Sequence, residues 1–172
     1  MFKKIAITGP ESTGKSQLAR QLAIHYNTIY VPEYAREYIN ILERPYNKQD
    51  ILEIAKGQFA KEKELESKAK KYLFCDTELI VTKIWCEHKY GNCHEWILEM
   101  INKNNYDLFL LTDIDLPWQA DPQREHPDLR EYLFQLYKKE LQKRNYNFEI
   151  VSGFDNQRIK NAIDIIDNYF RH

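Results

Sequence analysis

Short apolar segments alternate with longer amphipathic segments along this chain. The apolar runs are rich in Ile, Val, Leu, Phe and Tyr, as strands buried on both faces are, and they lie at 4–8, 28–32, 72–76, 107–113 and 148–152. Helical spacing of apolar residues fills the segments at 15–26, 34–43, 48–70, 78–104 with a break near Gly91, 128–144 and 155–169. This alternation of strand and helix predicts an α/β fold, with a five-stranded parallel sheet between two layers of helices.

Charge adds little to this picture. The charge-rich segment 61–71, KEKELESKAKK, predicts the solvated face of a long helix. The 25 Lys and Arg residues nearly balance the 26 Asp and Glu residues, and no basic stretch is long enough to form a local nucleic-acid surface. We therefore expect no nucleic-acid partner.

The N-terminus and the overall length bound location and organisation. The segment MFKKIAITG has an apolar run too short for a signal peptide or a membrane span, so we expect a cytoplasmic protein without a membrane partner. The 172 residues are 43% apolar and contain no linker or repeat, which predicts one domain over 1–172. Nothing in the sequence indicates the oligomeric state.

A cluster of cysteine and histidine residues raises the question of a metal site. Cys86, His88, Cys93 and His94 lie within nine residues, but their spacing matches no usual zinc-finger pattern. The three cysteines of the chain form an odd set without a secretory signal, which predicts reduced thiols. We expect ordinary helix and turn residues here, with zinc as the weaker alternative.

The strongest motif is GPESTGKS at residues 9–16. It fits G-x-x-x-x-G-K-[ST] between an apolar strand and an amphipathic helix, the context of a phosphate-binding loop. Glycines let successive N–H groups point at phosphate oxygens, Lys15 reaches the β- and γ-phosphates, and the Ser16 hydroxyl binds Mg²⁺. We therefore expect a nucleoside triphosphate to contact Gly9, Glu11, Ser12, Thr13, Gly14, Lys15, Ser16 and Gln17.

Carboxylates follow two of the predicted strands. Glu33, Tyr34 and Arg36 come after the second run, and Asp76 ends the third. Ligands of such sheets lie beyond the carboxyl ends of the strands. We place Asp76 on the Mg²⁺ side and Glu33, with Tyr34 and Arg36, on the acceptor side, although the two acidic roles could be exchanged. The alternative for each acid is a residue that stabilises a helix N-terminus.

The segment DIDLPWQADPQREHPDLR, residues 113–130, follows the fourth run and predicts a lid over the site at about 115–130. Arg124 and Arg130 suit the neutralisation of a transferring phosphoryl group. Trp118, with Asp115 and Asp121 nearby, suits a flat cationic acceptor, although Trp118 packed over a core edge is an equal alternative. After the last run, SGFDNQR is the expected place for adenine contacts, with Arg158 as a candidate.

These blocks together resemble the ribosylnicotinamide kinase domain of NadR-type NAD biosynthesis proteins. The similarity includes ITGPESTGKS, VPEYAREY, the GQ at 57–58, LFCDTELIVTKIWCEHKYG, YDLFLLTDIDLPWQADPQREHPDLR and VSGFDNQR, and thus nearly the whole chain. The resemblance implies a P-loop NTPase, nucleoside kinase-like three-layer sandwich. It also implies that ATP and Mg²⁺ are used to phosphorylate the 5′-hydroxyl of nicotinamide riboside, with Asp76, Trp118 and the lid arginines in the roles given above.

Two further hypotheses stay open on the sequence. The same loop and lid would serve a P-loop kinase for another nucleoside or nucleotide, or a nucleotide-sensing binding module without rapid turnover. The chain has no room for the helix-turn-helix and nucleotidyltransferase domains of full-length family members, so we expect neither of their activities. Whether nicotinic acid riboside is also an acceptor does not follow from the residues.

Overall fold

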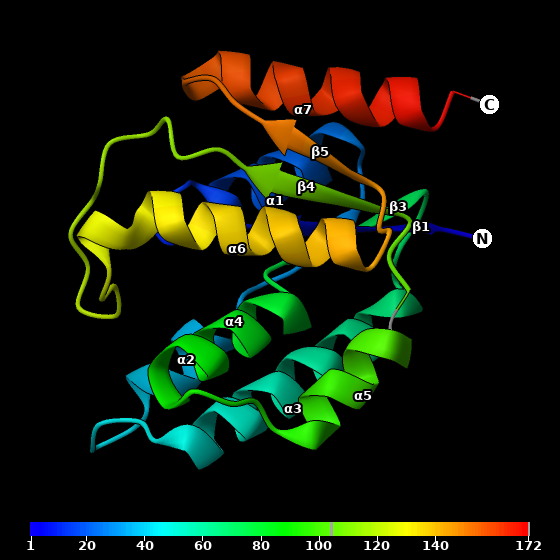
Figure 1. Ribbon diagram of the computed structural model, residues 1–172. Helices are drawn as coiled ribbons and strands as arrows, with labels where there is room; N and C mark the ends of the chain where they lie inside the picture. Colours follow the sequence, from blue (N-terminus) through cyan, green and yellow to red (C-terminus); the bar gives the residue numbers. More distant parts are fainter. Residues whose placement is uncertain (104, 172) are drawn as a thin grey trace.

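The computed structural model describes residues 1–103 and 105–171. The strands β1 (Lys3–Thr8), β2 (Ile29–Val31), β3 (Tyr72–Asp76), β4 (Leu108–Thr112) and β5 (Phe148–Val151) form one parallel sheet in the order β2-β3-β1-β4-β5 (Figure 1). The predicted five-stranded parallel sheet is therefore confirmed. Ile7 pairs with Asp76 across β1 and β3, so the phosphate-loop motif and the acid that ends β3 emerge at the same edge of the sheet.

Helices cover both faces of this sheet. They are α1 (Lys15–His25), α2 (Tyr34–Asn40), α3 (Lys48–Glu66), α4 (Leu79–Tyr90), α5 (Glu95–Lys103), α6 (Arg130–Lys143) and α7 (Asp155–Tyr169), with a short 3₁₀ turn at Pro127–Leu129. Helices α1 and α7 pack on one face, and α6 with the α3–α5 group lies on the other (Figure 1). The predicted break near Gly91 is confirmed, because Gly91 ends α4 in the left-handed conformation.

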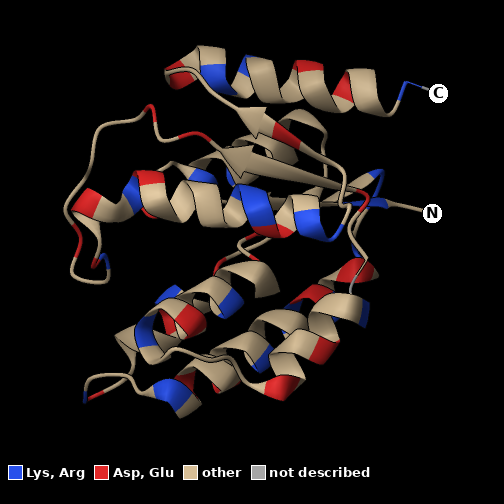
Figure 2. Ribbon diagram, in the orientation of Figure 1, with Lys and Arg blue, Asp and Glu red and all other residues tan. Residues whose placement is uncertain are grey.

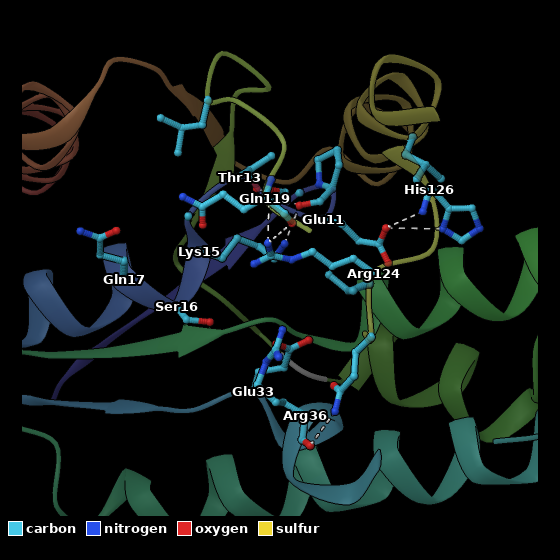
Figure 3. Close-up of a pocket in the computed structure, with 18 of the residues that line it drawn as sticks. Glu11, Thr13, Lys15, Ser16, Gln17, Glu33, Arg36, Gln119, Arg124 and His126 are labelled. Carbon is cyan, nitrogen blue, oxygen red and sulfur yellow. Dashed lines mark hydrogen bonds and ion pairs between the residues drawn. The ribbon is translucent and has the colours of Figure 1, made fainter. Parts of the chain in front are cut away.

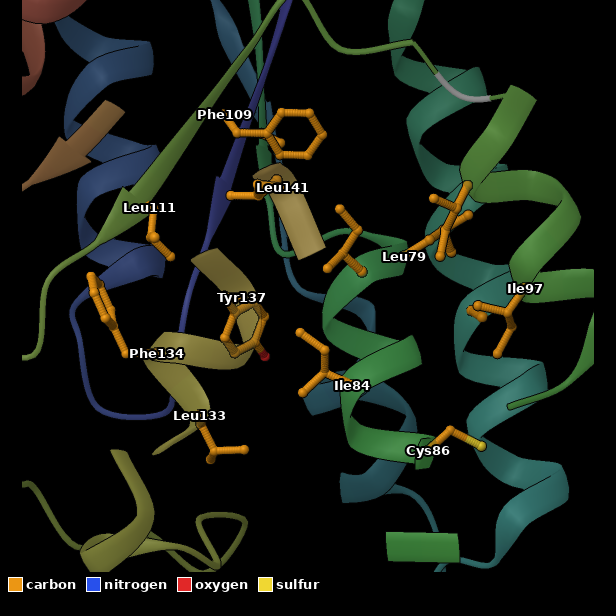
Figure 4. Close-up of a cluster of buried hydrophobic side chains, with 14 of the residues drawn as sticks. Leu79, Ile84, Cys86, Ile97, Phe109, Leu111, Leu133, Phe134, Tyr137 and Leu141 are labelled. Atoms are coloured by element: carbon orange, nitrogen blue, oxygen red, sulfur yellow. The ribbon is translucent and has the colours of Figure 1, made fainter. Parts of the chain in front are cut away.

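The core beneath the site joins β4, α6 and α4. Phe109 and Leu111 of β4, Tyr137 of α6 and Ile84 of α4 belong to one cluster of buried side chains (Figure 4). Each fully buried Leu, Ile or Phe side chain stabilises the fold by about 1.5–3 kcal/mol relative to exposure. This packing fixes α4 and α6 relative to the strand ends, and both helices continue into the walls of the site.

Two sequence predictions about burial are wrong in part. Strand β5 was expected to be buried on both faces, but Glu149 and Ile150 are exposed because β5 is an edge strand. The charged segment 61–71 was expected to be a solvated helix face, but α3 ends at Glu66 and the side chain of Glu62 is fully buried. Glu62 Oε2 lies 2.7 Å from Lys4 Nζ, and this ion pair compensates the burial of the charge.

Charge is distributed over the surface as the composition indicates. Figure 2 shows basic and acidic residues interspersed along the outer helices. None of the helices within residues 1–103 and 105–171 is both long enough and apolar enough to cross a bilayer.

Candidate active site

The phosphate-loop motif connects β1 to α1 in a tight turn. Gly9 adopts a φ of 137°, and a Cβ atom there would lie 2.5 Å from Thr112 Oγ1, so β4 leaves no room for a side chain. The loop is closed by Thr13, whose hydroxyl donates to the Pro10 carbonyl at 2.8 Å and shares a 2.7 Å hydrogen bond with Thr112 Oγ1. The first turn of α1 lines the cavity, and the N–H groups and dipole at a helix N-terminus favour an anion there.

Charged groups gather at the start of α1. Lys15 is partly buried, and its ammonium donates to the Pro10 carbonyl at 2.6 Å (Figure 3). Burial lowers the pKa of Lys15, and the carboxylates of Glu33, Asp76 and Glu11 oppose that shift. The ends of β1, β2 and β3 thus bring a cation and two strand-end carboxylates to one place.

Burial also governs the two strand-end acids. Burial raises the pKa of Glu33, and the neighbouring charge of Asp76 raises it further. Burial raises the pKa of Asp76 as well, opposed by the Ser16 hydroxyl and the Lys15 ammonium. A carboxylate with a raised pKa can accept a proton near neutral pH, and a serine hydroxyl beside a carboxylate supplies the oxygen ligands that Mg²⁺ prefers.

The segment 115–130 lies across the phosphate loop. Glu11 accepts hydrogen bonds from the backbone N–H groups of Glu125 at 3.2 Å and His126 at 3.0 Å (Figure 3). The Gln119 N–H donates to Ser12 Oγ at 2.8 Å, and Arg124 Nη1 lies 3.4 Å from the same oxygen. Loop and segment are therefore joined by several hydrogen bonds, with Arg124 directed at the phosphate loop.

A cavity of about 620 Å³ extends from the phosphate loop toward α4 and α6. Gly9 to Leu18 form one end, while Phe154 and Asp155 lie at the border of α7. The other end is mainly aromatic and aliphatic, with His88, His126 and Glu125 among its polar groups, and is lined by Ile39, Tyr46, Val81, Ile84, Trp85, Leu133 and Tyr137. The cavity thus joins a polar phosphate end to an apolar, aromatic end.

The aromatic end is ordered by hydrogen bonds to one phenol. Trp85 Nε1 donates to Tyr46 Oη at 3.0 Å, and the Tyr46 hydroxyl donates to Glu125 Oε2 at 2.8 Å. The rings of Tyr46 and Trp85 meet edge to face at 4.9 Å between centroids. Lys89 pairs with Glu125 at 3.2 Å, so the segment 115–130 is also fixed to the wall formed by α4.

Residues 4–158 match the sequence model of a family described as an AAA domain, and this match includes the phosphate loop, both strand-end acids and the segment over the loop. The chain belongs to this AAA-domain family.

Sequence comparison with curated proteins identifies relatives of this AAA domain. It is 30% identical over 126 residues to the trifunctional NAD biosynthesis/regulator protein NadR of Salmonella typhimurium strain LT2, and equally to NadR of Escherichia coli strain K12. The matched region covers 69% of this chain and 30% of each relative. The AAA domain is therefore homologous to NadR, and it matches only a part of the relatives' length.

Comparison with solved structures shows which proteins share the fold of this domain. A NadR protein in complex with NR superposes with a TM-score of 0.79 at 24% identity, over 99% of this chain and 50% of that chain. A thymidylate kinase from Ehrlichia chaffeensis superposes with a TM-score of 0.66 at 14% identity, over 96% of this chain and 97% of that chain. A deoxyadenosine kinase from M. mycoides reaches 0.62 at 16% identity, over 96% and 99%. The AAA domain thus has the fold of nucleoside and thymidylate kinases.

Many of the residues expected at the site share the cavity of the AAA domain. Those that line it are Gly9, Glu11, Ser12, Thr13, Gly14, Lys15, Ser16, Gln17, Glu33, Arg36, Arg124 and Arg158. Asp76 is not a lining residue, because it is buried with an exposed fraction of 1%, but its charge acts on Lys15 and Glu33. The strand-end acids and the phosphate loop are therefore brought together as the parallel sheet requires.

Other expected residues lie outside the cavity lining. The Arg130 guanidinium donates to the backbone carbonyls of Ser12 at 3.2 Å and Leu116 at 2.8 Å, and its Cζ atom lies 5.9 Å from the centroid of the Trp118 ring. Asp121 accepts from Arg36 at 2.9 Å, which connects the segment 115–130 to α2. Tyr34 donates its backbone N–H to Gln58 Oε1 at 2.9 Å, and its ring packs on Gly57.

Arg158 and Asp115 form an internal clamp. Arg158 Nη1 pairs with Asp115 at 2.6 Å, and its Nη2 donates to the backbone carbonyls of Thr13 at 2.9 Å and Asp113 at 3.0 Å. Asp115 also accepts from the Gly153 N–H at 2.5 Å. These contacts hold the phosphate loop, the end of β4 and the start of α7 together, so much of the bonding capacity of both side chains is used within the protein.

The aromatic end of the cavity was missed by sequence reasoning. Val81, Ile84, Trp85 and His88 line it from α4. Their spacing of three and four residues places them on one face of α4, which begins three residues after the acid at the end of β3. That spacing was the available signal, but it is equally typical of a helix face packed in a core.

The cysteine and histidine cluster divides between two environments. Cys86 is buried against the core, while His88 lines the cavity and packs edge to face on His126. His94 Nε2 hydrogen-bonds to the Lys48 carbonyl at 2.9 Å. Within residues 1–103 and 105–171 no group of three or more His, Cys, Asp or Glu side chains is arranged to hold a metal ion.

Proposed function

We propose that this AAA domain is a kinase that transfers the γ-phosphoryl group of ATP to the 5′-hydroxyl of nicotinamide riboside, which gives nicotinamide mononucleotide. The observation that carries the proposal is the single cavity with a phosphate loop and two strand-end carboxylates at one end and an aromatic chamber at the other. Positioning and charge stabilisation are the main requirements of phosphoryl transfer, and this arrangement provides both.

The residues at the start of α1 fit a Mg²⁺ ion. The Ser16 hydroxyl and the Asp76 carboxylate lie close enough for Ser16 to oppose the rise in the Asp76 pKa, and both are hard oxygen ligands. They would hold the ion, which supplies neutralisation of phosphate charge when bound. The Lys15 ammonium and the loop N–H groups would bind the β- and γ-phosphates, with Arg124 directed at the same region.

Glu33 is the proposed general base. It lines the cavity between the phosphate loop and α2, and burial with the adjacent Asp76 charge raises its pKa. A raised pKa favours acceptance of the proton from an acceptor hydroxyl. Arg36 lies 4.0 Å from Glu33 and also pairs with Asp121, so it fixes the carboxylate relative to the segment 115–130.

The aromatic end of the cavity is the proposed acceptor site. Nicotinamide riboside carries a flat cationic ring, which gains from the π faces of Trp85 and Tyr46 and from the carboxylate of Glu125. The homology to NadR, a NAD biosynthesis protein, and the fold shared with a NadR protein in complex with NR support this acceptor. The purine of ATP would lie at the opposite end, where Phe154 and Asp155 border the cavity.

The test measures ADP release from ATP and Mg²⁺ by the purified chain. Nicotinamide riboside, nicotinic acid riboside, ordinary nucleosides and thymidylate are compared with a reaction that lacks an acceptor. Strong stimulation by nicotinamide riboside is expected, and its loss by at least about a hundredfold in Lys15→Ala would assign turnover to this site.

Other outcomes would replace the proposal. Stimulation by another nucleoside or nucleotide alone would keep the kinase and overturn the acceptor. Nucleotide binding without stimulation by any acceptor would favour a nucleotide-sensing module. Near-normal turnover in Lys15→Ala would contradict the hypothesis that this cavity is the active site of a kinase, whatever the acceptor.

A further inference from the structure

Glu78 is a buried carboxylate just beyond the acid that ends β3, and it has no place in the chemistry proposed above. Its exposed fraction is 1%, and it does not line the cavity. Glu78 Oε1 accepts from Thr8 Oγ1 at 2.9 Å, and Oε2 accepts from the Ile80 N–H at 2.6 Å. One carboxylate therefore joins the last residue of β1 to the N-terminus of α4.

The contact with Thr8 continues through a row of buried threonines into the phosphate loop. Thr112 Oγ1 lies 3.0 Å from the Thr8 carbonyl and 2.7 Å from Thr13 Oγ1, so its single proton can be donated to either oxygen. Thr13 Oγ1 in turn lies 2.8 Å from the Pro10 carbonyl, which also accepts from Lys15 Nζ. A chain of polar contacts thus runs from Lys15 to the first turn of α4, and within it the carbonyl and the hydroxyl of Thr8 are connected by the covalent structure of that residue.

The two ends of this chain belong to different halves of the cavity. The phosphate loop forms the nucleotide end, and α4 presents Val81, Ile84, Trp85 and His88 to the acceptor end. Both oxygens of the buried Glu78 carboxyl group take part in hydrogen bonds, and loss of one partner leaves a polar atom without compensation in a dry interior. Glu78 is the group where the chain passes from one half to the other.

We propose that Glu78 is a positioning residue that holds the phosphate loop and α4 in one relative placement, so that the phosphoryl group and the acceptor hydroxyl meet in the cavity. This inference rests on the proposed kinase function for its kinetic effect, but the structural coupling it describes requires only nucleotide binding. A shift of α4 by about 1 Å is enough to lower turnover by about a hundredfold, because reacting groups must be aligned.

Thr8→Val removes the hydroxyl that Glu78 accepts from and keeps the shape of the side chain. The matched control is Thr82→Val, because Thr82 is also buried, in α4, but its hydroxyl donates to Leu79 O at 2.9 Å within its own helix. We expect Thr8→Val to lower kcat by about tenfold or more with a smaller change in KM for ATP, Thr8→Ser to restore kcat, and Thr82→Val to stay within about twofold. In a Glu78→Gln background, Thr8→Val should cost less than in the wild type.

A second measurement is independent of the acceptor. Binding of AMP-PNP and Mg²⁺ should slow amide exchange at residues 79–84 in the wild type and in Thr82→Val, but not in Thr8→Val. If no acceptor stimulates ADP release, the proposed function fails and the exchange measurement alone decides this inference. Equal slowing of exchange in Thr8→Val, or equal losses of kcat in Thr8→Val and Thr82→Val, would overturn it.

Discussion

Trp85 and Trp118 differ in what their indole rings contact. Trp85 lines the cavity, and its Nε1 atom donates to the Tyr46 hydroxyl at 3.0 Å. The Trp118 ring lies near the Arg130 guanidinium, with 5.9 Å between Cζ and the ring centroid, and is not part of the cavity lining. We therefore propose that Trp85, which comes from a different element, supplies the aromatic surface for the acceptor in place of Trp118.

Substitution of each tryptophan separates these two roles. Trp85→Ala should raise KM for nicotinamide riboside by about tenfold or more with little change in KM for ATP, because stacking of an aromatic ligand contributes roughly 1–3 kcal/mol. Trp118→Ala is the matched control and should change KM for nicotinamide riboside by less than about threefold. Steady-state kinetics with both substrates varied checks this, and the reverse order of the two variants would return the acceptor role to Trp118.

Asp50 predicts a pH dependence of stability at the start of α3. Its carboxylate pairs with Arg44 at 2.6 Å and accepts the Asn47 N–H at 2.7 Å in a capping box. The Arg44 hydrogen bond, followed by the Asn47 N–H, lowers the pKa of Asp50 in the folded state. Because the folded pKa lies below the unfolded value of about 3.9, the stability it contributes is fully present above that value and is lost as pH falls further.

The free energy of unfolding tests this sign. Asp50→Asn should lower it by roughly 1 kcal/mol at pH 7, as expected for the loss of a helix-capping interaction, and by less at pH 3. Urea denaturation at both pH values measures the difference. Glu43→Gln, at an exposed position just before Arg44, should show no such change, and a pH-independent effect of Asp50→Asn would contradict the assignment.

Helices α2 and α3 meet at a glycine on which a tyrosine ring packs closely. Gly57 lies in the middle of α3, and a Cβ atom there would lie 2.0 Å from Tyr34 Cε1. Gln58 next to it accepts the Tyr34 N–H that begins α2. This contact sets how α2, with Arg36 and Ile39 on the cavity wall, lies against α3.

Gly57→Ala should therefore destabilise the protein. In an open helix, replacement of glycine by alanine stabilises by about 1 kcal/mol, so a lower denaturation midpoint would report the contact with Tyr34. The same substitution in a Tyr34→Ala background should be neutral or stabilising, because the ring that occupies the space is gone. A midpoint that rises with Gly57→Ala alone would show that α2 does not depend on this approach.

In the whole molecule, the segment 115–130 connects the two sides of the cavity. Glu11 holds the backbone of Glu125 and His126 from the phosphate loop, and the side chain of Glu125 contacts Tyr46 and Lys89 on the other side. Arg36 adds a contact from α2 to Asp121. These contacts hold the segment in place over the cavity.

Glu11→Ala should loosen this segment. Loss of hydrogen bonds to a carboxylate, at roughly 1.5 kcal/mol, should speed amide exchange at Glu125 and His126 by about tenfold. Glu37→Ala is the control, because Glu37 is an exposed carboxylate on α2 that pairs with Lys61 at 2.8 Å, away from the segment. Equal exchange rates in the wild type and Glu11→Ala would mean that other contacts hold the segment.

Features that depend on local spacing could be predicted from the amino-acid sequence. Alternating apolar runs and helical segments predicted the parallel sheet, and GPESTGKS predicted the phosphate loop, since each rests on residues close together in the chain. The acids at the ends of β2 and β3 were placed at the site because parallel strands end at one edge of a sheet.

Which side chains line the aromatic end of the cavity, and which are used within the protein, depends on how the helices pack on the sheet. Trp85 and Leu133 line the aromatic end of the cavity from helices far apart in the sequence. No local sequence pattern distinguishes such a helix face from one packed in the core. Arg158 and Asp115 were expected to contact ligands because of their charges. In the structure they pair with each other, although they lie 43 residues apart in the sequence. Which distant polar groups pair with each other depends on how the helices and the sheet pack. This pairing cannot be predicted from local sequence patterns.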